Sequence, residues 1–286
     1  MTPNSSPRQV NPLHLLRSPL PAARPGPFPT PTIGTVLVVH GATDDDFEAI
    51  ERTAWMGERA GVGVVVQNRL GDERRTAEVL RRTKRLGAVH VSEVSPSFAT
   101  ACTVGAHTAI EFARVRHKPI DWLLFTQADC SYDLGDVHAA ISHALAHQGA
   151  DPYPPAIGVS GGLIADWPSQ PFSGLIERGR QARHGTAPQV QAVDWIAGYW
   201  FVVPVSAYMR AGGWDPDYSL YFEDVDLSLR LALIGCRSVI HPGLGVDHAR
   251  SVTTKPAFGD HRFLLQEQAR DRFLRIWTRI CQDPEP

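Results

Sequence analysis

Residues 35 to 147 alternate between short apolar runs and longer segments with helical signals. The runs are Thr35–His40, Val62–Val66, Ala88–Val91 and Trp122–Thr126, and the helical segments cover 47–60, 73–86, 98–113 and 134–147. A short run rich in β-branched residues, without polar alternation, is typical of a strand buried on both faces. Four repeats of strand and helix predict an α/β fold with a mostly parallel central sheet and helices on both faces.

Capping residues mark the start of three of these helices. Asp44 precedes the first, Ser95 or Ser97 precedes the helix at Phe98, and Asp133 precedes the helix that runs to about residue 147. Short polar side chains at such positions accept hydrogen bonds from first-turn amides. We therefore expect these helices to begin just after the capping residues.

The remainder of the chain is less regular. Residues 1–32 are rich in proline and are expected to form a disordered tail, because proline forbids a continued helix and cannot donate to a sheet. The single large domain is expected over 33–255, with strands at 156–160 and 238–240, a helix at 225–234 and an irregular, mobile loop at 169–191. Residues 256–286 are expected to carry an amphipathic helix.

Composition argues against several classes of protein, including nucleic-acid-binding and membrane-spanning proteins. The chain has 286 residues, with 28 basic and 30 acidic side chains, so it lacks the basic excess of a nucleic-acid-binding protein. Its four cysteines form no CxxC pair, which argues against a zinc or disulfide framework. No apolar run reaches the ~18–20 residues of a membrane span. A cytoplasmic enzyme is the expectation, either free or at the inner face of the membrane.

Acidic side chains lie where a parallel sheet binds ligands, at the carboxyl ends of its strands. Gln127-Ala128-Asp129 follows the fourth predicted strand. The Asp129 carboxylate suits Mg²⁺ or Mn²⁺, which prefer oxygen ligands, although an aspartate at a turn can also serve its local backbone. His248 follows the last predicted strand, and both a structural and a metal-binding role stay open for it.

A second acidic cluster, Tyr221-Phe222-Glu223-Asp224-Val225-Asp226, comes shortly after Gly212-Gly213-Trp214-Asp215. The positive end of a helix dipole favours ionised carboxylates, which serves a general base and serves simple helix capping equally well. Capping explains Asp224 or Asp226 but not the whole cluster, because two aromatic residues precede the acids.

These motifs resemble the family 2 glycosyltransferases, of the rhamnosyltransferase-like and cell-surface polysaccharide branch. The resemblance extends from about Thr35 to Ser251, and the motifs that carry it are Asp194–Gly198, Gly212–Asp215, Tyr221–Leu227, Arg230, Gly235 and Val246–His248. It implies the GT-A fold, with a Rossmann-like N-terminal half. It also implies an inverting transfer of a sugar from a UDP-, dTDP- or GDP-linked donor to an acceptor hydroxyl on a glycan, a lipid-linked sugar or a small molecule.

The resemblance also assigns roles to residues. Asp224 takes the role of general base, with Glu223 beside it as an orienting group. Asp129, in the motif that begins at Gln127, binds Mg²⁺ or Mn²⁺, and His248 is a further candidate ligand. His40 and Gly41, after the first strand, are expected at the nucleotide. Trp195, Gly198 and Tyr199, with Trp200, are candidates for sugar or acceptor binding, although aromatic residues here can also fill the core.

The chain departs from the family pattern at positions where the family binds the nucleotide of the donor. Gln127 replaces the first acid of its motif, and Gln67 and Asn68 stand where the family has an aspartate. Ser95–Phe98 and Thr103 replace two further family positions. The donor base is therefore open, and a non-catalytic nucleotide-binding or scaffold protein is the main alternative. A nucleotidyltransferase is disfavoured, because residues 41–46 are acidic where such enzymes have a basic, glycine-rich loop.

The C-terminal helix leaves three alternatives. Its apolar face, which includes Phe273 and Trp277, could dock on its own domain, pair with a second subunit in a homodimer, or approach a membrane surface.

Overall fold

The computed structural model describes residues 19–39, 44–68, 73–93, 97–164, 190–241, 243–248 and 259–282. The strands are β1 (Ile33–Val39), β2 (Gly61–Asn68), β3 (Val89–Glu93), β4 (Trp122–Gln127), β5 (Cys130–Ser131), β6 (Ala156–Gly158), β7 (Gly161–Gly162), β8 (Gln191–Val193), β9 (Trp195–Ile196), β10 (Trp200–Pro204), β11 (Ser238–Ile240) and β12 (Asp247–His248). The helices are α1 (Asp44–Ala60), α2 (Glu73–Arg85), α3 (Phe98–Val115), α4 (Leu134–Ala146), α5 (Val205–Arg210), α6 (Glu223–Leu233) and α8 (His261–Gln282).

The central sheet has the strand order β3-β2-β1-β4-β10-β6-β11-β8. Strand β1 pairs in parallel with β2 and β4, whereas β10 runs antiparallel between β4 and β6, and β8 runs antiparallel at the edge. The register sets Val39 opposite Gln67 and Val38 opposite Gln127. The predicted, mostly parallel α/β sheet is confirmed, and the ends of its first, second and fourth strands meet at one edge.

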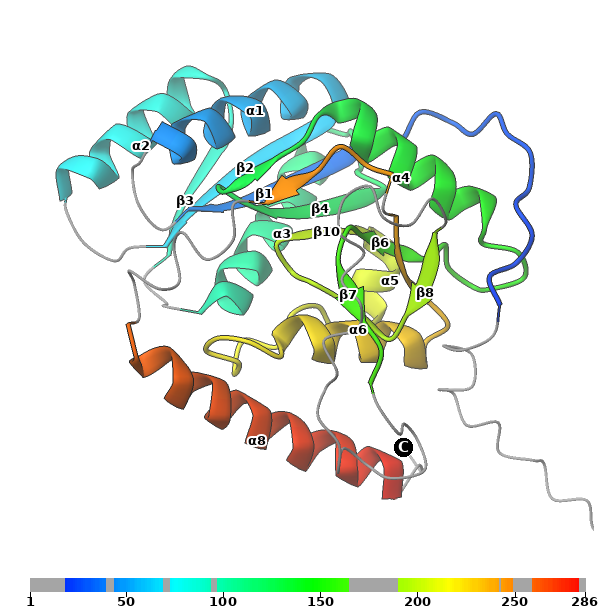
Figure 1. Ribbon diagram of the computed structural model, residues 1–286. Coiled ribbons are helices and arrows are strands. Elements are labelled where there is room, and N and C mark those ends of the chain that lie inside the picture. Colours follow the sequence, from blue (N-terminus) through cyan, green and yellow to red (C-terminus); the bar gives the residue numbers. More distant parts are fainter. Residues whose placement is uncertain are drawn as a thin grey trace, which may run out of the picture.

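Helices cover both faces of this sheet (Figure 1). On one face, α1, α2 and α4 pack over the strands, and on the other face lie α3, α5 and α6. Side chains along β1 alternate between these layers, with Val36 and Val38 toward α3, and Leu37 and Val39 toward α1. Helix α3 lies so close to the sheet that a Cβ at Gly105 would collide with Val36 and Val66.

Two of the predicted helix caps are present. Ser97 accepts a hydrogen bond from the Thr100 amide at 3.3 Å, and Asp133 forms a reciprocal capping box with Asp136. Asp44 differs from the prediction, because it is the first residue of α1 rather than the residue before it. Three successive aspartates favour the first helical turn, where the helix dipole is positive, so the helix extends to include them.

The described part of the predicted N-terminal tail, residues 19–32, contacts the domain. It forms no helix or strand, as its prolines predict. However, the Arg24 amide donates to the Ala146 carbonyl at 2.9 Å, the His147 ring lies 2.7 Å from the Pro21 carbonyl, and Thr32 Oγ1 donates to Asp121 at 2.6 Å. This part of the segment is therefore ordered against α4 and the start of β4, contrary to the expected disorder.

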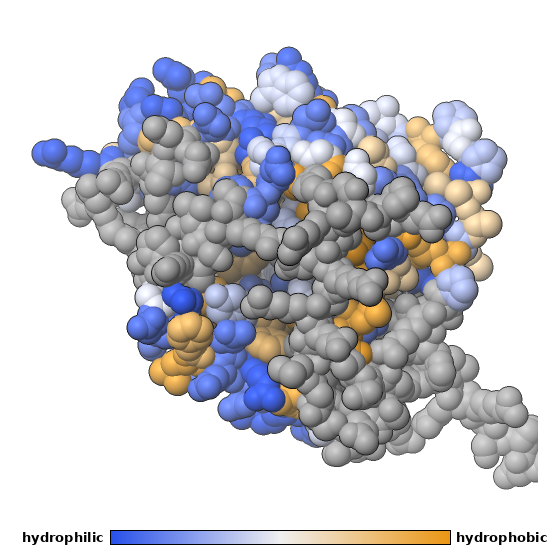
Figure 2. All heavy atoms as spheres, in the orientation of Figure 1, coloured by the Kyte–Doolittle hydropathy of each residue, from blue (hydrophilic) through white to orange (hydrophobic). Residues whose placement is uncertain are grey.

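Helix α8 docks on its own domain, which is the first of the three alternatives. Phe273 and Trp277 are fully buried against residues of α6, including Leu229. Its first turn leaves Phe263 and Leu264 54% and 48% exposed. Figure 2 shows apolar side chains at the lower left of the molecule, on the side where Figure 1 places the start of α8. Within the described ranges, no helix is both long and apolar enough to cross a bilayer.

Candidate active site

The acidic cluster begins helix α6 from a strained turn. Tyr221 and Phe222 both adopt left-handed backbone angles, with φ of 68° and 66°. Such a conformation costs an ordinary side chain about 1–3 kcal/mol and is found mainly at functional sites. Phe222 occupies the N-cap position without a side-chain hydrogen bond, so the two following acids belong to the first turn itself.

Asp224 is partly exposed and is held by two backbone amides. Its Oδ2 accepts from Gly198 N at 3.0 Å, and its Oδ1 accepts from Val225 N at 2.9 Å. Burial raises the pKa of the Asp224 carboxyl to about 6, and the two amides act in the opposite direction. The group is thus ionised at neutral pH yet basic enough to accept a proton, as a general base requires.

Glu223 has a different environment. It is buried, and its Oε2 has no hydrogen-bond partner among the described residues. Burial raises the pKa of the Glu223 carboxyl to about 8, and the neighbouring Asp224 charge adds to this effect. Adjacent carboxyls whose pKa values are pushed apart can hold different protonation states at one pH. We therefore expect protonated Glu223 beside ionised Asp224 near neutral pH.

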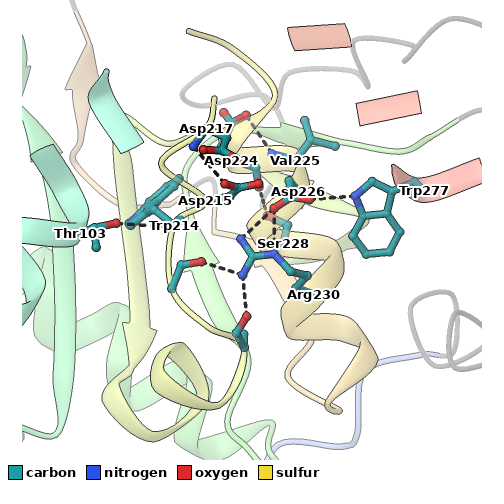
Figure 3. Close-up of polar contacts among 12 residues, drawn as sticks. Thr103, Trp214, Asp215, Asp217, Asp224, Val225, Asp226, Ser228, Arg230 and Trp277 are labelled. Carbon is teal, nitrogen blue, oxygen red and sulfur yellow. Dashed lines mark hydrogen bonds and ion pairs between the residues drawn. The ribbon is translucent and has the colours of Figure 1, made fainter. Parts of the chain in front are cut away.

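Asp226 is committed to structure. Its Oδ2 forms an ion pair with Arg230 at 2.8 Å, and its Oδ1 accepts from Trp277 Nε1 at 2.9 Å (Figure 3). Arg230 also donates to the carbonyls of Ala211 and Gly213, at 2.5 and 2.6 Å. These contacts join α6, α8 and the Gly-Gly turn, which explains why the acidic cluster and the Gly212–Asp215 motif occur together.

Thr103, one of the departures from the family pattern, supports the same turn. Its Oγ1 donates to the Trp214 carbonyl at 3.2 Å (Figure 3). Ser97 Oγ likewise donates to the Tyr218 carbonyl at 2.6 Å. Both residues anchor the segment that leads into Glu223, a role that their sequence positions did not reveal.

Gly198 and Tyr199 connect the acidic cluster to a second group of side chains. The Gly198 amide binds Asp224, and the Tyr199 carbonyl accepts from the Gln127 amide at 3.2 Å and from the Cys130 thiol at 3.3 Å. The Tyr199 ring stacks on the His248 ring, with centroids 3.9 Å apart and planes 10° apart. A single dipeptide therefore contacts both predicted centres.

The second group contains the predicted metal ligands. Strand β12 pairs with β5, so that His248 lies opposite Cys130. His248 Nε2 is 3.3 Å from Asp129 Oδ2, and ligand atoms of Asp129, Cys130 and His248 lie within 4.8 Å of one another. Asp129 Oδ1 is buried without a hydrogen-bond partner among the described residues. An unsatisfied carboxylate oxygen among converging donors fits a divalent cation.

These residues line a cavity of about 410 Å³ that also includes Glu48 and Arg52 from α1. Arg52 donates to the Cys130 carbonyl, and its guanidinium lies 4.9 Å from the Tyr132 ring centroid. A guanidinium beside a metal centre is suited to phosphate oxygens. Arg52 was not among the predicted site residues, because its signal in the sequence is a single basic side chain one turn after Glu48 on the helix that follows β1.

The other predicted site residues are distributed unevenly. Gln67 is buried, and its Oε1 lies 3.1 Å from His90 Nε2, whereas Asn68 ends β2 opposite Glu93. His40, Gly41 and nearly all of the predicted loop at 169–191 lie outside the described residues. Trp195 is partly exposed and packs toward α6 and α8. Trp200 is fully buried in the core, which is the core-filling alternative for this residue.

Comparison with known proteins agrees with the motif resemblance. An N-acetylglucosaminyl-diphospho-decaprenol L-rhamnosyltransferase of Mycobacterium tuberculosis is 30% identical over 155 residues, which cover 47% of this chain and 48% of that protein. A rhamnosyltransferase of Escherichia coli is 43% identical over 56 residues, which cover 20% and 21% of the two chains. The chain thus spans about half or less of the length of these curated relatives. No protein-family model matches the chain.

A solved structure extends the likeness to the fold. GalNAc-T7, crystallised with UDP, GalNAc and Mn²⁺, superposes with a TM-score of 0.54 at 14% identity, over 77% of this chain and 44% of that one. Together these likenesses confirm the resemblance to rhamnosyltransferases and the GT-A type of fold.

Proposed function

We propose that this rhamnosyltransferase-like chain with a GT-A fold is an inverting glycosyltransferase. It transfers a sugar from a nucleotide-diphosphate donor to an acceptor hydroxyl. The observation that carries the proposal is the partly exposed Asp224 carboxylate, held by Gly198 next to the tyrosine that contacts the Asp129 and His248 group. The base thus contacts Gly198, and the cation site contacts the next residue, Tyr199.

Asp224 acts as the general base. Its carboxylate takes the proton of the acceptor hydroxyl as that oxygen attacks the anomeric carbon, a role worth ~10²–10⁴-fold in rate. Gly198 N and Val225 N hold both oxygens, so the carboxylate keeps its orientation, and no side chain in the described part of the chain competes for the proton. Attack opposite the leaving group inverts the anomeric centre.

Asp129 and His248 hold Mg²⁺ or Mn²⁺, with Tyr199 fixing the plane of the imidazole. When bound, the cation neutralises the charge that develops on the departing diphosphate. Arg52, in the same cavity, provides a second positive charge for the phosphate oxygens. Gln67 and Gln127, at the ends of β2 and β4, bind the nucleotide together with Asn68, His40 and Gly41. The partly exposed Trp195 and Tyr199 contact the acceptor sugar, and the buried Gly198 and Glu223 support that side of the site next to Asp224.

The names of the relatives favour an acceptor that is a lipid-linked sugar diphosphate and a donor that delivers L-rhamnose. The experiment is release of free nucleotide from UDP-, GDP- and dTDP-sugars with Mn²⁺, measured with and without such an acceptor. Acceptor-dependent release from one donor is the expected result. Tight donor binding without release would favour the non-catalytic alternative, and neither binding nor release would contradict the proposal.

A further inference from the structure

The cation centre contains a sulfur donor that the oxygen chemistry of Mg²⁺ and Mn²⁺ does not require. Cys130 is buried at the wall of the cavity, and its side chain lies across the β5–β12 ladder from His248. Directly opposed residues of two antiparallel strands present their side chains to the same face, about 4.5–5.5 Å apart at Cβ. This pairing, together with Asp129 next in sequence, brings carboxylate, thiol and imidazole together.

The spacing of these donors suits a single small ion. Oxygen and nitrogen ligands at about 2.0 Å from a tetrahedral metal lie about 3.3 Å from each other. Asp129 Oδ2 and His248 Nε2 are 3.3 Å apart, and the cysteine donor completes a set within 4.8 Å. The Cys130 thiol donates to the Tyr199 carbonyl at 3.3 Å, and metal binding would replace this hydrogen bond.

The chemical identity of the donors also discriminates between ions. Mg²⁺ and Ca²⁺ take oxygen ligands, and imidazole with thiolate is the ligand set of Zn²⁺ and related thiophilic ions. Three protein ligands leave one tetrahedral position open, as in catalytic zinc sites, and all three residues line the cavity. The lack of a CxxC pair argues against a zinc site built from paired cysteines, but the pairing of β5 with β12 forms a mixed site from distant residues.

We propose that Asp129, Cys130 and His248 form a three-ligand site that binds a thiophilic divalent cation, of the Zn²⁺ class, in preference to Mg²⁺. The proposal rests on the proposed cation site, to which it adds the third ligand and the selectivity. Binding displaces the thiol proton to solvent and forms a metal–sulfur bond, with no change in oxidation state. Such an ion would compete with Mg²⁺ and Mn²⁺ for the same Asp129 and His248 atoms.

The test uses Co²⁺ as a spectroscopic probe of the full-length, metal-free protein, without donor or acceptor. A thiolate ligand gives Co²⁺ a sulfur-to-metal charge-transfer band in the near ultraviolet, which oxygen and nitrogen ligands do not give. We expect the band in the wild type and in Cys281→Ser, a control cysteine on α8, and we expect it to be absent from Cys130→Ser. Competing Zn²⁺ should remove it stoichiometrically, whereas excess Mg²⁺ should not.

Metal affinities measured by calorimetry separate the contribution of the Cys130 sulfur from that of the other ligands. Zn²⁺ affinity should fall by about tenfold or more in Cys130→Ser, with a much smaller change for Mn²⁺. Asp129→Ala should lower the affinity for both Zn²⁺ and Mn²⁺. Equal Zn²⁺ affinity in wild type and Cys130→Ser, or a Co²⁺ spectrum without the charge-transfer band, would overturn the thiolate ligand while leaving the proposed transferase intact. Circular dichroism of Cys130→Ser confirms that the variant is folded.

Discussion

The Gly198 amide donates to Asp224 Oδ2 over 3.0 Å, and this contact fixes the proposed base relative to β10 and the cation site. The next residue, Tyr199, stacks on His248. The position of the base and the orientation of a metal ligand therefore depend on the same two residues of the loop between β9 and β10. Changes in this loop should affect catalysis more than folding.

Gly198→Ala tests this dependence. A Cβ there would lie 3.3 Å from Phe98, which is tight, and 3.4 Å from Trp214 and 3.5 Å from Asp224, which are ordinary contact distances. Relief of the Phe98 contact would shift the Gly198 amide that holds the base. Small misplacements of reacting groups cost up to about 10²-fold in rate. We expect kcat to fall by about ten- to a hundredfold, with little change in donor affinity or melting temperature. A large loss of stability, with activity kept in the folded fraction, would instead assign Gly198 to packing.

Glu223→Gln should stabilise the protein in a pH-dependent way. The Glu223 pKa lies near 4.5 in the unfolded chain and at about 8 when folded, so the folded state binds the extra proton between these values. The free energy of unfolding of the wild type therefore falls as pH rises across this window. Glutamine does not titrate, so the stability of the variant does not fall with pH for this reason. The difference in urea midpoint between the variant and the wild type should therefore be larger at pH 8 than at pH 5. Glu267→Gln, exposed on α8, should show no such difference.

The pH profile of the wild type should reflect the Asp224 carboxyl. A general base acts only when it is ionised, and the pKa of Asp224 is raised to about 6. We expect kcat/KM to fall about tenfold per pH unit below about 6, and to be flat just above it. Donor binding measured at pH 5 and pH 7 by calorimetry separates this effect from loss of the substrate complex. If kcat/KM fell only near pH 4, burial would not raise the pKa of Asp224.

Trp277→Phe should destabilise the junction of α8 with the acidic turn. The Trp277 indole is fully buried and donates to the charged Asp226 Oδ1 at 2.9 Å. Losing a hydrogen bond to a charged group costs about 1.5–3 kcal/mol. Trp55→Phe is the matched control, because Trp55 is 43% exposed on α1 and should change stability by no more than ~0.5 kcal/mol. If the two variants lowered the free energy of unfolding by the same amount, the hydrogen bond from Trp277 to Asp226 would contribute little to stability.

The local pattern predicted the first half of the fold well. Strands β1 to β4 fall within two residues of the predicted runs, because buried parallel strands are continuous and apolar. The antiparallel insertion of β10 between β4 and β6 was not predicted, since strand direction depends on tertiary connections rather than on composition.

The acidic cluster and the strand-end aspartate were found from the sequence, because they are motifs placed at a helix start and a strand end. The β5–β12 ladder could not be found in this way. Each strand has two residues, too few for a period, and their partners are more than a hundred positions apart. The joint position of Cys130 and His248, and the entry of Arg52 from α1, arise only when these distant segments pair.

The most direct measurement of the central claim is single-turnover sugar transfer by Asp224→Asn, alongside donor binding by calorimetry. Asparagine keeps the shape, and its one carbonyl oxygen can still accept from Gly198 N, although the hydrogen bond from Val225 N is lost. It cannot take a proton from the acceptor. The account predicts loss of transfer by about 10²–10⁴-fold, with donor affinity and melting temperature close to wild type. Asp217→Asn, an exposed acid nearby, should retain full activity. Wild-type transfer by Asp224→Asn would show that another group removes the proton.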